Sequence, residues 1–242
     1  MSEHIVISRA DGVLEIRLNR PEKKNALTRP MYEAICVAFD QADADPAVRV
    51  VLLTGTGDAF TSGNDVKDFQ KPAQEGPNRP GGGRFLPTLS KLQTPLVAAV
   101  NGMAIGVGTT MLFHCDLIVA ARSARFQMPF TSLGVVPEAA SSLLAPATLG
   151  HRRASALLLL GESIDAATAL DWGLINSVVD DAALPPQAVR LTKRLIRHGA
   201  PDVAGRIDEE LVLFRERLAS PEAQEAFAAF MEKRKPDFSR FS

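Results

Sequence analysis

The sequence predicts an α/β fold with a helical region at its carboxyl end. Three short aliphatic runs bounded by turn residues, 48–53, 96–100 and 117–120, are typical of fully buried parallel strands. Amphipathic segments separate them, and this alternation of strands and helices indicates an α/β sheet. The 242-residue chain is long enough for one large domain, or for a domain with an appended subdomain.

The chain opens with a predicted β-hairpin. Apolar residues alternate with polar ones in 5–8 and again in 13–18. Asp11 and Gly12 lie between the two runs and are typical of a tight hairpin turn.

Two helices are predicted between the aliphatic strands. In 30–44, Met31, Ile35 and Phe39 recur at helical spacing and share one face. The second predicted helix spans 106–114 and begins directly after a glycine turn.

Helical patterns dominate from Pro137 onward, and only 176–179 still indicates a strand. The predicted helices are 137–148, 151–160, 166–172, 185–198, 202–219 and 222–233. The last three suggest a separate layer that either covers the core or builds an oligomer. We therefore predict a core over residues 1–184 and a helical region over residues 185–242.

One segment, 71–87, lacks any helical or strand pattern. It contains four prolines and four glycines, so it is predicted to be a mobile loop. Loops of this length in compact domains are either functional lids or unstructured segments, and the sequence leaves both open.

The composition narrows the classes of partner. The net charge is −1, so no global positive field favours nucleic acid or an anionic membrane. Cys36 and Cys115 show no metal-ligand spacing, and we expect them to be buried thiols in a reducing compartment. The amino terminus lacks the features of a signal peptide, and polar residues interrupt the apolar stretch 95–121. A cytoplasmic protein without a membrane span is expected.

The first string with chemical potential is 18–27, LNRPEKKNAL, which follows a strand and precedes a helix. Arg20, Lys23 and Lys24 lie in this turn, where cations can hold phosphates. Taken alone, a solvated basic turn explains the string better.

The second string is 60–66, FTSGNDV, which follows the strand 48–53 and its glycine-rich turn. Gly63 permits a sharp backbone turn, and such turns can leave a neighbouring N–H unpaired in a cleft. Taken alone, an ordinary β-turn is the simpler interpretation.

The third string is 99–110, AVNGMAIGVGTT, in which a strand passes through glycines into a helix. The N–H groups at a helix amino terminus are free and favour negative charge. The string is not a dinucleotide fingerprint, because a third glycine at the required spacing is missing.

In this order and spacing, the three strings resemble the enoyl-CoA hydratase/isomerase (crotonase) family. The resemblance continues through CDLIVA at 115–120, SLG at 132–134, AL at 169–170 with GL at 173–174, and FMEKRKP at 230–236. It implies a spiral of ββα repeats whose carboxyl-terminal helices form a trimer or a hexamer. It also implies an acyl-CoA thioester as the substrate.

The resemblance further implies an oxyanion hole made by the main-chain N–H groups of Asn64 and Val107. Such donors stabilise the charge that develops on the thioester oxygen when a carbanion forms at C2, and one donor can contribute about 3 kcal/mol. The resemblance also places coenzyme A beside residues of the first two strings and of the last predicted helix. These residues are Lys23, Lys24, Ala26, Ser62, Asp65, Val66, Phe230 and Lys233.

The same resemblance separates two reactions. Hydratases of the family use two carboxylates, and the matching positions here are Thr110 and Phe130, neither of which transfers protons at neutral pH. Glu138, within LGVVPEAASS at 133–142, matches the base of the peroxisomal-type Δ3,Δ2-enoyl-CoA isomerases. A first-turn glutamate that only complements the helix dipole is the simpler alternative.

The environment of Glu138 is predicted to combine opposing effects. Pro137 at the first helical position would place Glu138 in the first turn, where the helix favours its ionised form. An apolar pocket would favour the neutral form. The residues expected to build this pocket are Phe130, Val135, Val136 and Leu143.

Removal of a proton from C2 of a 3-enoyl-CoA by Glu138 and its return to C4 is therefore the expected reaction. It requires no metal or redox cofactor, because coenzyme A is part of the substrate. The alternatives are a hydratase or another lyase of the family, and a non-catalytic acyl-CoA-binding protein.

Overall fold

The computed structural model describes residues 2–65, 84–133 and 135–181, together with residues 232 and 234. The chain divides into two compact units, 1–196 and 197–242. All the helices and strands that the structure describes lie in the first unit.

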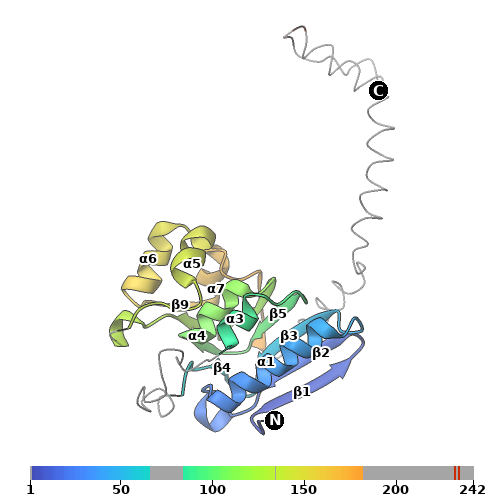
Figure 1. The fold of residues 1–242 in the computed structure, drawn as a ribbon. Coiled ribbons are helices and arrows are strands. Elements are labelled where there is room, and N and C mark those ends of the chain that lie inside the picture. Colours follow the sequence, from blue (N-terminus) through green and yellow to red (C-terminus); the bar gives the residue numbers. More distant parts are fainter. Residues whose placement is uncertain (1, 66–83, 134, 182–231, 233, 235–242) are drawn as a thin grey trace. The chain divides into compact units, whose positions relative to one another are not determined.

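The larger sheet has six strands in the order β1-β2-β3-β5-β7-β10 (Figure 1). The strands are β1 (Ile5–Ala10), β2 (Val13–Leu18), β3 (Val50–Gly55), β5 (Leu96–Val100), β7 (Leu117–Ala121) and β10 (Ser177–Val179). The first two form the predicted hairpin around Asp11 and Gly12, both at positive φ, and all later neighbours are parallel. Each strand predicted from an aliphatic run is present, so these predictions are confirmed.

The smaller sheet has four strands in the order β4-β6-β8-β9. They are β4 (Ala59–Thr61), β6 (Met103–Ile105), β8 (Arg125–Gln127) and β9 (Ser163–Asp165). None of these strands was predicted, because three residues are too few for a periodic pattern. The strands β3, β5 and β7 of the larger sheet are each followed by a strand of the smaller one and then by a helix, so the predicted spiral of ββα repeats is confirmed.

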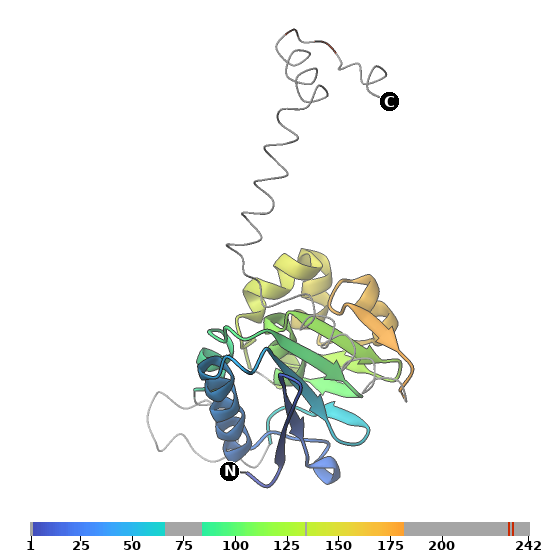
Figure 2. The same ribbon diagram turned by 90° about the vertical axis from the view of Figure 1, so that its right-hand side faces the viewer.

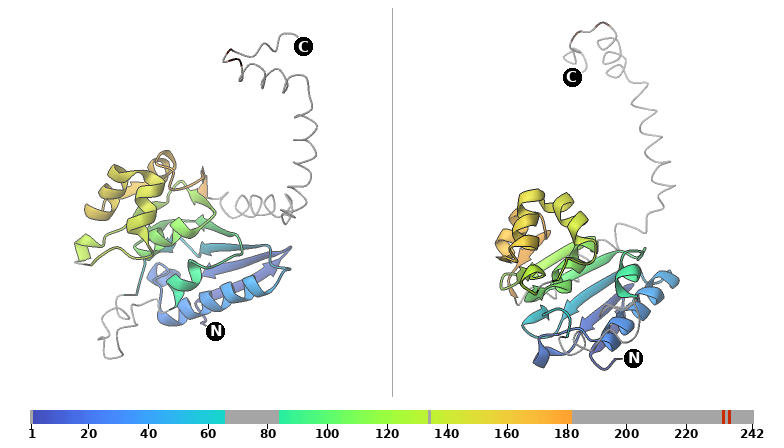
Figure 3. Two further views of the ribbon diagram at one scale, coloured as in Figure 1. Left: turned by 45° about the horizontal axis from the view of Figure 1, so that its top comes forward. Right: turned by 60° about the vertical axis from the view of Figure 1, so that its left-hand side comes forward.

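The described helices are α1 (Arg29–Ala44), α3 (Phe85–Leu89), α4 (Val107–Thr110), α5 (Ser141–Leu149), α6 (His151–Leu159) and α7 (Ala166–Asp171). Short 3-10 turns occur at η1 (Pro21–Lys23), η2 (Met111–His114) and η3 (Thr131–Leu133). Figure 2 and Figure 3 show α1 along one face of the β1–β2–β3 end of the larger sheet, with α5, α6 and α7 gathered at the other end.

Two helix predictions and one loop prediction need correction. The segment predicted as one helix over 106–114 is α4 followed by the 3-10 turn η2. The helix predicted to start at Pro137 starts at Ser141, because Ala139 and Ala140 adopt left-handed conformations, with φ of 54° and 53°. The end of the predicted loop 71–87 belongs to α3 from Phe85 onward.

Several predictions lie outside the described residues. They comprise the helices at 185–198, 202–219 and 222–233, apart from Glu232, the loop residues 71–83 and the boundary between 184 and 185. Among the described helices, none combines the length and apolarity that a membrane crossing requires.

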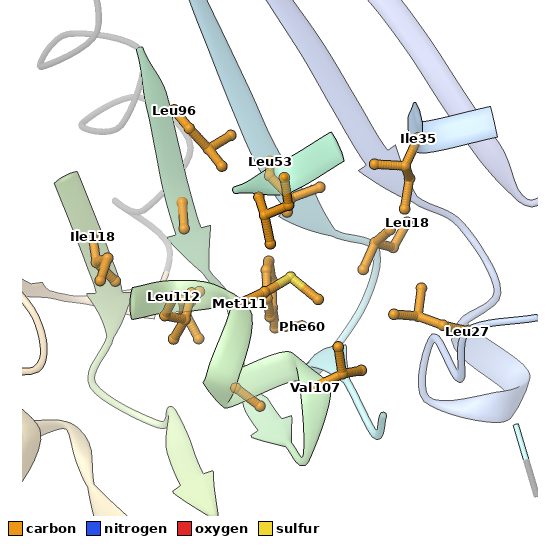
Figure 4. Packing of buried hydrophobic residues seen from close by; sticks show 14 of the residues in the cluster. Leu18, Leu27, Ile35, Leu53, Phe60, Leu96, Val107, Met111, Leu112 and Ile118 are labelled. Atoms are coloured by element: carbon orange, nitrogen blue, oxygen red, sulfur yellow. The ribbon is translucent and has the colours of Figure 1, made fainter. Parts of the chain in front are cut away.

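The core lies on the face of the larger sheet that α1 covers. Val51 and Leu53 of β3 belong to the main cluster of buried residues, whereas Val50 and Leu52 belong to a smaller cluster on the opposite face. This alternation explains the continuous aliphatic run of a strand buried on both faces. Figure 4 shows Phe60 among the main-cluster residues, which joins the start of the smaller sheet to the core. Cys36 and Cys115 are free thiols, of which Cys36 is buried, as predicted, and Cys115 is half-buried.

Two asparagines hold the three sequence strings together. The Asn25 side chain is fully buried and donates to the carbonyl oxygens of Thr56 and Ala59, at 2.9 and 2.7 Å. The Asn101 side chain accepts from the Gly55 N–H at 3.0 Å and also donates to the Ala59 oxygen at 3.1 Å. The first and third strings are therefore both bonded to the segment that leads into β4.

Gly102 allows the third string to lie close to the main chain at Asp58, in the segment that leads into β4. A Cβ atom at this position would lie 2.0 Å from the Asp58 carbonyl oxygen, a distance that no real side chain reaches. We predict that Gly102→Ala destabilises the protein by about 3 kcal/mol, the upper part of the usual range for overpacking. Gly173→Ala is the matched control, because Gly173 has open space but a φ of 80°, and it is expected to cost about 1 kcal/mol. Urea unfolding measures both costs, and equal values would contradict the prediction.

Candidate active site

The carboxyl ends of β4 and β6 bring Asn64 and Val107 to the same edge of the smaller sheet. β4 and β6 pair in parallel, with Thr61 opposite Ala104. Their continuations stay close, because a Cβ atom on Gly63 would lie 2.8 Å from the Ile105 carbonyl oxygen. Glycine at position 63, at a φ of 92°, therefore permits the approach that the second and third strings need.

Val107 offers a free N–H at this edge. It is the first residue of α4, and the first N–H groups of a helix have no partner within the helix. Gly106, at a φ of 57°, turns the chain from β6 into α4, and its own N–H donates to the Gln127 carbonyl. The Thr109 and Thr110 N–H groups donate to the Gly106 oxygen, so in this turn the N–H groups of Val107 and Gly108 remain for a ligand.

The main-chain N–H of Asn64 is the second free donor. It stays free because Asn64 forms a parallel bridge with Leu27 that uses only the main-chain groups on either side of this N–H. In this bridge the Leu27 N–H donates to the Gly63 oxygen at 2.8 Å, and the Asp65 N–H donates to the Leu27 oxygen at 2.9 Å. The N–H of Asn64 itself takes no part in the bridge. Among the described residues, neither this N–H nor that of Val107 has a hydrogen-bond partner.

Glu138 lies in a left-handed turn between η3 and α5, and three bonds fix this turn. The Ser141 N–H and hydroxyl both donate to the Glu138 carbonyl oxygen, at 2.9 and 2.6 Å. The His114 ring, through Nε2, bonds to the Ala139 carbonyl oxygen at 2.9 Å. Because His114 belongs to η2, the turn that carries Glu138 is tied to the segment that continues α4.

The Glu138 carboxyl group is held in a poorly solvated place. Burial raises its pKa above the usual range, and the nearby Thr110 hydroxyl opposes part of this rise. Their contact falls short of hydrogen-bond geometry, since Glu138 Oε1 and Thr110 Oγ1 are both buried without a partner in the described part of the chain. A carboxylate in such surroundings is a stronger base than one in water.

This environment differs from the predicted one in two ways. Glu138 precedes the helix by a left-handed turn, so the first-turn position that would have favoured its ionised form is wrong. Of the apolar residues expected around it, Phe130 is buried, whereas Val136 and Leu143 are 82% and 70% exposed. Burial by the surrounding chain, rather than a ring of these aliphatic residues, raises the pKa.

Thr110 and Phe130, the positions that would carry carboxylates in a hydratase, lie in the same region. Thr110 ends α4 and is fully buried, and Phe130 precedes the loop that leads to Glu138. The Val135 N–H donates to the Phe130 oxygen at 2.9 Å and closes the start of that loop.

Sequence reasoning missed Tyr32, which the structure also places here. Tyr32 lies in α1, is 3% exposed, and donates its hydroxyl to Asn64 Oδ1 at 2.5 Å. Burial raises its pKa well above the usual value, and the charge of Glu138 adds to the rise. The helical pattern of 30–44 did not predict this contact with Asn64, because an aromatic residue beside Met31 is typical of any core-facing helix.

The structure gathers five of the eight residues assigned to coenzyme A. The Ser62 N–H donates to the Lys24 oxygen at 2.9 Å, and Asp65 forms an ion pair with Arg20 at 2.6 Å. Arg20 also donates to the Ala26 oxygen at 3.1 Å. Lys23 lies in η1 beside them.

Lys24 already has a partner in this group, because its ammonium group pairs with Asp58 at 2.7 Å. The remaining predicted residues, Val66, Phe230 and Lys233, lie outside the described residues.

Known proteins are similar to this chain over nearly its whole length. Among curated proteins, the chain is 34% identical to 1,2-epoxyphenylacetyl-CoA isomerase of Escherichia coli over 99% of both chains. It is also 34% identical to enoyl-CoA delta isomerase 2 of Rattus norvegicus, matching 96% of this chain and 64% of that protein. A 2,3-dehydroadipyl-CoA hydratase of Escherichia coli is 31% identical over 98% of this chain and 99% of that protein.

A solved structure supports the fold. Pseudomonas aeruginosa OdaA superposes with a TM-score of 0.79 at 44% identity, covering 95% of this chain and 99% of that one. The family model described as enoyl-CoA hydratase/isomerase matches residues 8–208. The chain therefore belongs to the enoyl-CoA hydratase/isomerase family.

Proposed function

We propose that this protein isomerises 3-enoyl-CoA thioesters to trans-2-enoyl-CoA thioesters, with Glu138 as the acid–base group. The observation that carries the proposal is the half-buried carboxyl group of Glu138, whose pKa is raised and which interacts with Thr110 of α4 and with Tyr32, the partner of Asn64. The unpaired main-chain N–H groups of Asn64 and Val107 follow the neighbouring strands β4 and β6. A general base whose pKa approaches the working pH transfers protons most effectively.

The reaction begins with removal of a proton from C2 by the Glu138 carboxylate. The electrons of the C2–H bond form a dienolate, whose negative charge develops on the thioester oxygen. The N–H groups of Asn64 and Val107 stabilise this charge without reorganising. Glu138 then returns the proton to C4, and the double bond lies between C2 and C3. Neither step needs a metal or a redox cofactor.

Two observations oppose the alternatives. Direct hydration by two carboxylates is disfavoured by Thr110 and Phe130, although one relative is named a hydratase. A non-catalytic acyl-CoA-binding protein would gain stability by replacing Glu138, because a buried carboxylate without a hydrogen bond to Oε1 opposes folding. The trimer or hexamer that the resemblance implies stays a prediction.

We predict that Glu138→Gln lowers kcat for 3-enoyl-CoA by at least about 100-fold, because it removes the base and keeps the size and polarity of the side chain. The matched control is Glu162→Gln, which alters an exposed glutamate and should leave kcat unchanged. The thermal midpoint of Glu138→Gln should not fall at neutral pH, since the variant loses a buried charge. A variant with wild-type turnover, or a wild type that hydrates 2-enoyl-CoA faster than it isomerises 3-enoyl-CoA, would refute the assignment.

The raised pKa of Glu138 predicts the acid limb of the pH profile. Protonation inactivates the base, so kcat/KM should fall with decreasing pH at a midpoint above that of an ordinary carboxyl group. Thr110→Val keeps the shape of the side chain and removes the hydroxyl that lowers this pKa, so the midpoint should move to higher pH. Thr131→Val, at an exposed position, is the control. A midpoint that is the same in Thr110→Val and wild type would contradict the contact.

We also propose that coenzyme A lies beside Lys23, Lys24, Ala26, Ser62 and Asp65, with Val66, Phe230 and Lys233 completing its site. Lys24→Ala should raise KM by about two- to fivefold with little change in kcat, since an exposed charge contact is worth up to about 1 kcal/mol. Lys233→Ala should act in the same direction.

Asp58→Asn sharpens this test, because it releases the Lys24 ammonium group from its ion pair. KM should then fall below the wild-type value. Initial-rate measurements at several acyl-CoA concentrations give both constants, and an unchanged KM in Lys24→Ala would remove this lysine from the site.

A further inference from the structure

The only tyrosine of the chain is buried against the proposed oxyanion donor. Its hydroxyl donates to the side-chain oxygen of Asn64, which leaves the amide nitrogen of Asn64 without a partner among the described residues. The ring itself is fixed by its neighbours, because its centroid lies 4.9 Å from that of Phe85, which stacks in turn on Phe39 at 6.4 Å. The hydroxyl therefore has a defined position.

Asn64 is thus held from two sides. Its main chain is tied to Leu27 through the bonds of Gly63 and Asp65, and its side chain is tied to α1 through Tyr32. The main-chain bonds act on the two peptide groups that flank residue 64, and the first of these, between Gly63 and Asn64, carries the proposed donor N–H. The bond from Tyr32 adds a restraint on the side chain of residue 64, the only one among the described residues.

We propose that Tyr32 is a positioning residue, whose hydroxyl holds the Asn64 side chain and so keeps the Asn64 main-chain N–H directed at the thioester oxygen. The inference rests on the proposed function, since it requires that this N–H stabilise a dienolate. Donors preorganised in this way act because they need no rearrangement as the charge develops.

Two features distinguish this role from simple packing. A phenylalanine would fill the same space beside Phe85 without burying a hydroxyl group, and burial of a polar group opposes folding unless it is bonded. In addition, burial, and after it the charge of Glu138, raises the pKa of the Tyr32 phenol, so the phenol stays protonated and remains a donor where Glu138 is ionised.

Tyr32→Phe, Asn64→Ala and the double variant test the proposal. The first readout is the split between kcat and KM for 3-enoyl-CoA. The second is the ultraviolet band of the enolate that acetoacetyl-CoA forms when its thioester oxygen is stabilised, which reports the oxyanion donors without proton return to C4. The matched control is Thr54→Val, which removes another buried, hydrogen-bonded hydroxyl, that of Thr54 in β3.

We expect Tyr32→Phe to lower kcat by about 10- to 100-fold, because a displaced donor is weakened rather than lost. KM should change less than about twofold, and the enolate band should weaken, whereas Thr54→Val should lose stability alone. The double variant should be no slower than the slower single variant, because both remove one interaction.

The inference is wrong if Tyr32→Phe keeps the wild-type kcat and enolate band, or if the two single losses multiply in the double variant. It is also wrong if Asn64→Ala, which removes the acceptor and keeps the phenol, retains both readouts. This variant decides the matter should Tyr32→Phe fail to fold. A wild type that neither isomerises 3-enoyl-CoA nor forms the enolate would refute the proposed function and the inference with it, whereas failure of the inference alone leaves an active wild type.

Discussion

The close approach of two main-chain segments, 55–64 and 101–108, is the constraint on which the rest of this structure depends. The space between them is so small that Gly102 cannot carry a side chain, and the carboxamide of Asn101 replaces the bonds that a longer strand would make. A second carboxamide, from Asn25, approaches from the basic turn. β4 and β6 have only three residues each, and the Asn64 and Val107 N–H groups that follow them have no partner among the described residues.

The proposed acid–base group, Glu138, belongs to a different segment, and two contacts link that segment to this junction. His114 connects the segment after α4 to the turn of Glu138, and Thr110 faces the carboxyl group from the end of α4 itself. The turn that carries the proposed base is therefore bonded to the segment that continues from Val107, one of the proposed oxyanion donors. The left-handed conformations of Ala139 and Ala140 are unfavourable for residues with a Cβ atom, and this strain is consistent with a segment that positions a reactive side chain.

Sequence patterns predicted the larger sheet and α1, because buried strands and amphipathic helices have periodic signatures. The candidate site residues came instead from the resemblance to a family. The patterns failed where structure depends on tertiary contacts. The three-residue strands of the smaller sheet have no period, and Pro137 followed by Glu138 carries the signature of a helix start although the helix begins at Ser141. The positive φ of Ala139 and Ala140 cannot be predicted from their residue type. The bond between Tyr32 and Asn64 joins positions 32 residues apart, which only the folded chain reveals.

The chain contains a single tyrosine and a single tryptophan, and the fold separates them. Tyr32 lies in α1 against Asn64, whereas Trp172 follows α7 beneath the guanidinium group of Arg153, 5.6 Å from the ring centroid. Each chromophore is thus a label that needs no chemical modification. The near-ultraviolet circular dichroism of the phenol reports the surroundings of residue 64, and indole fluorescence reports the packing of the helices at the other end of the sheet.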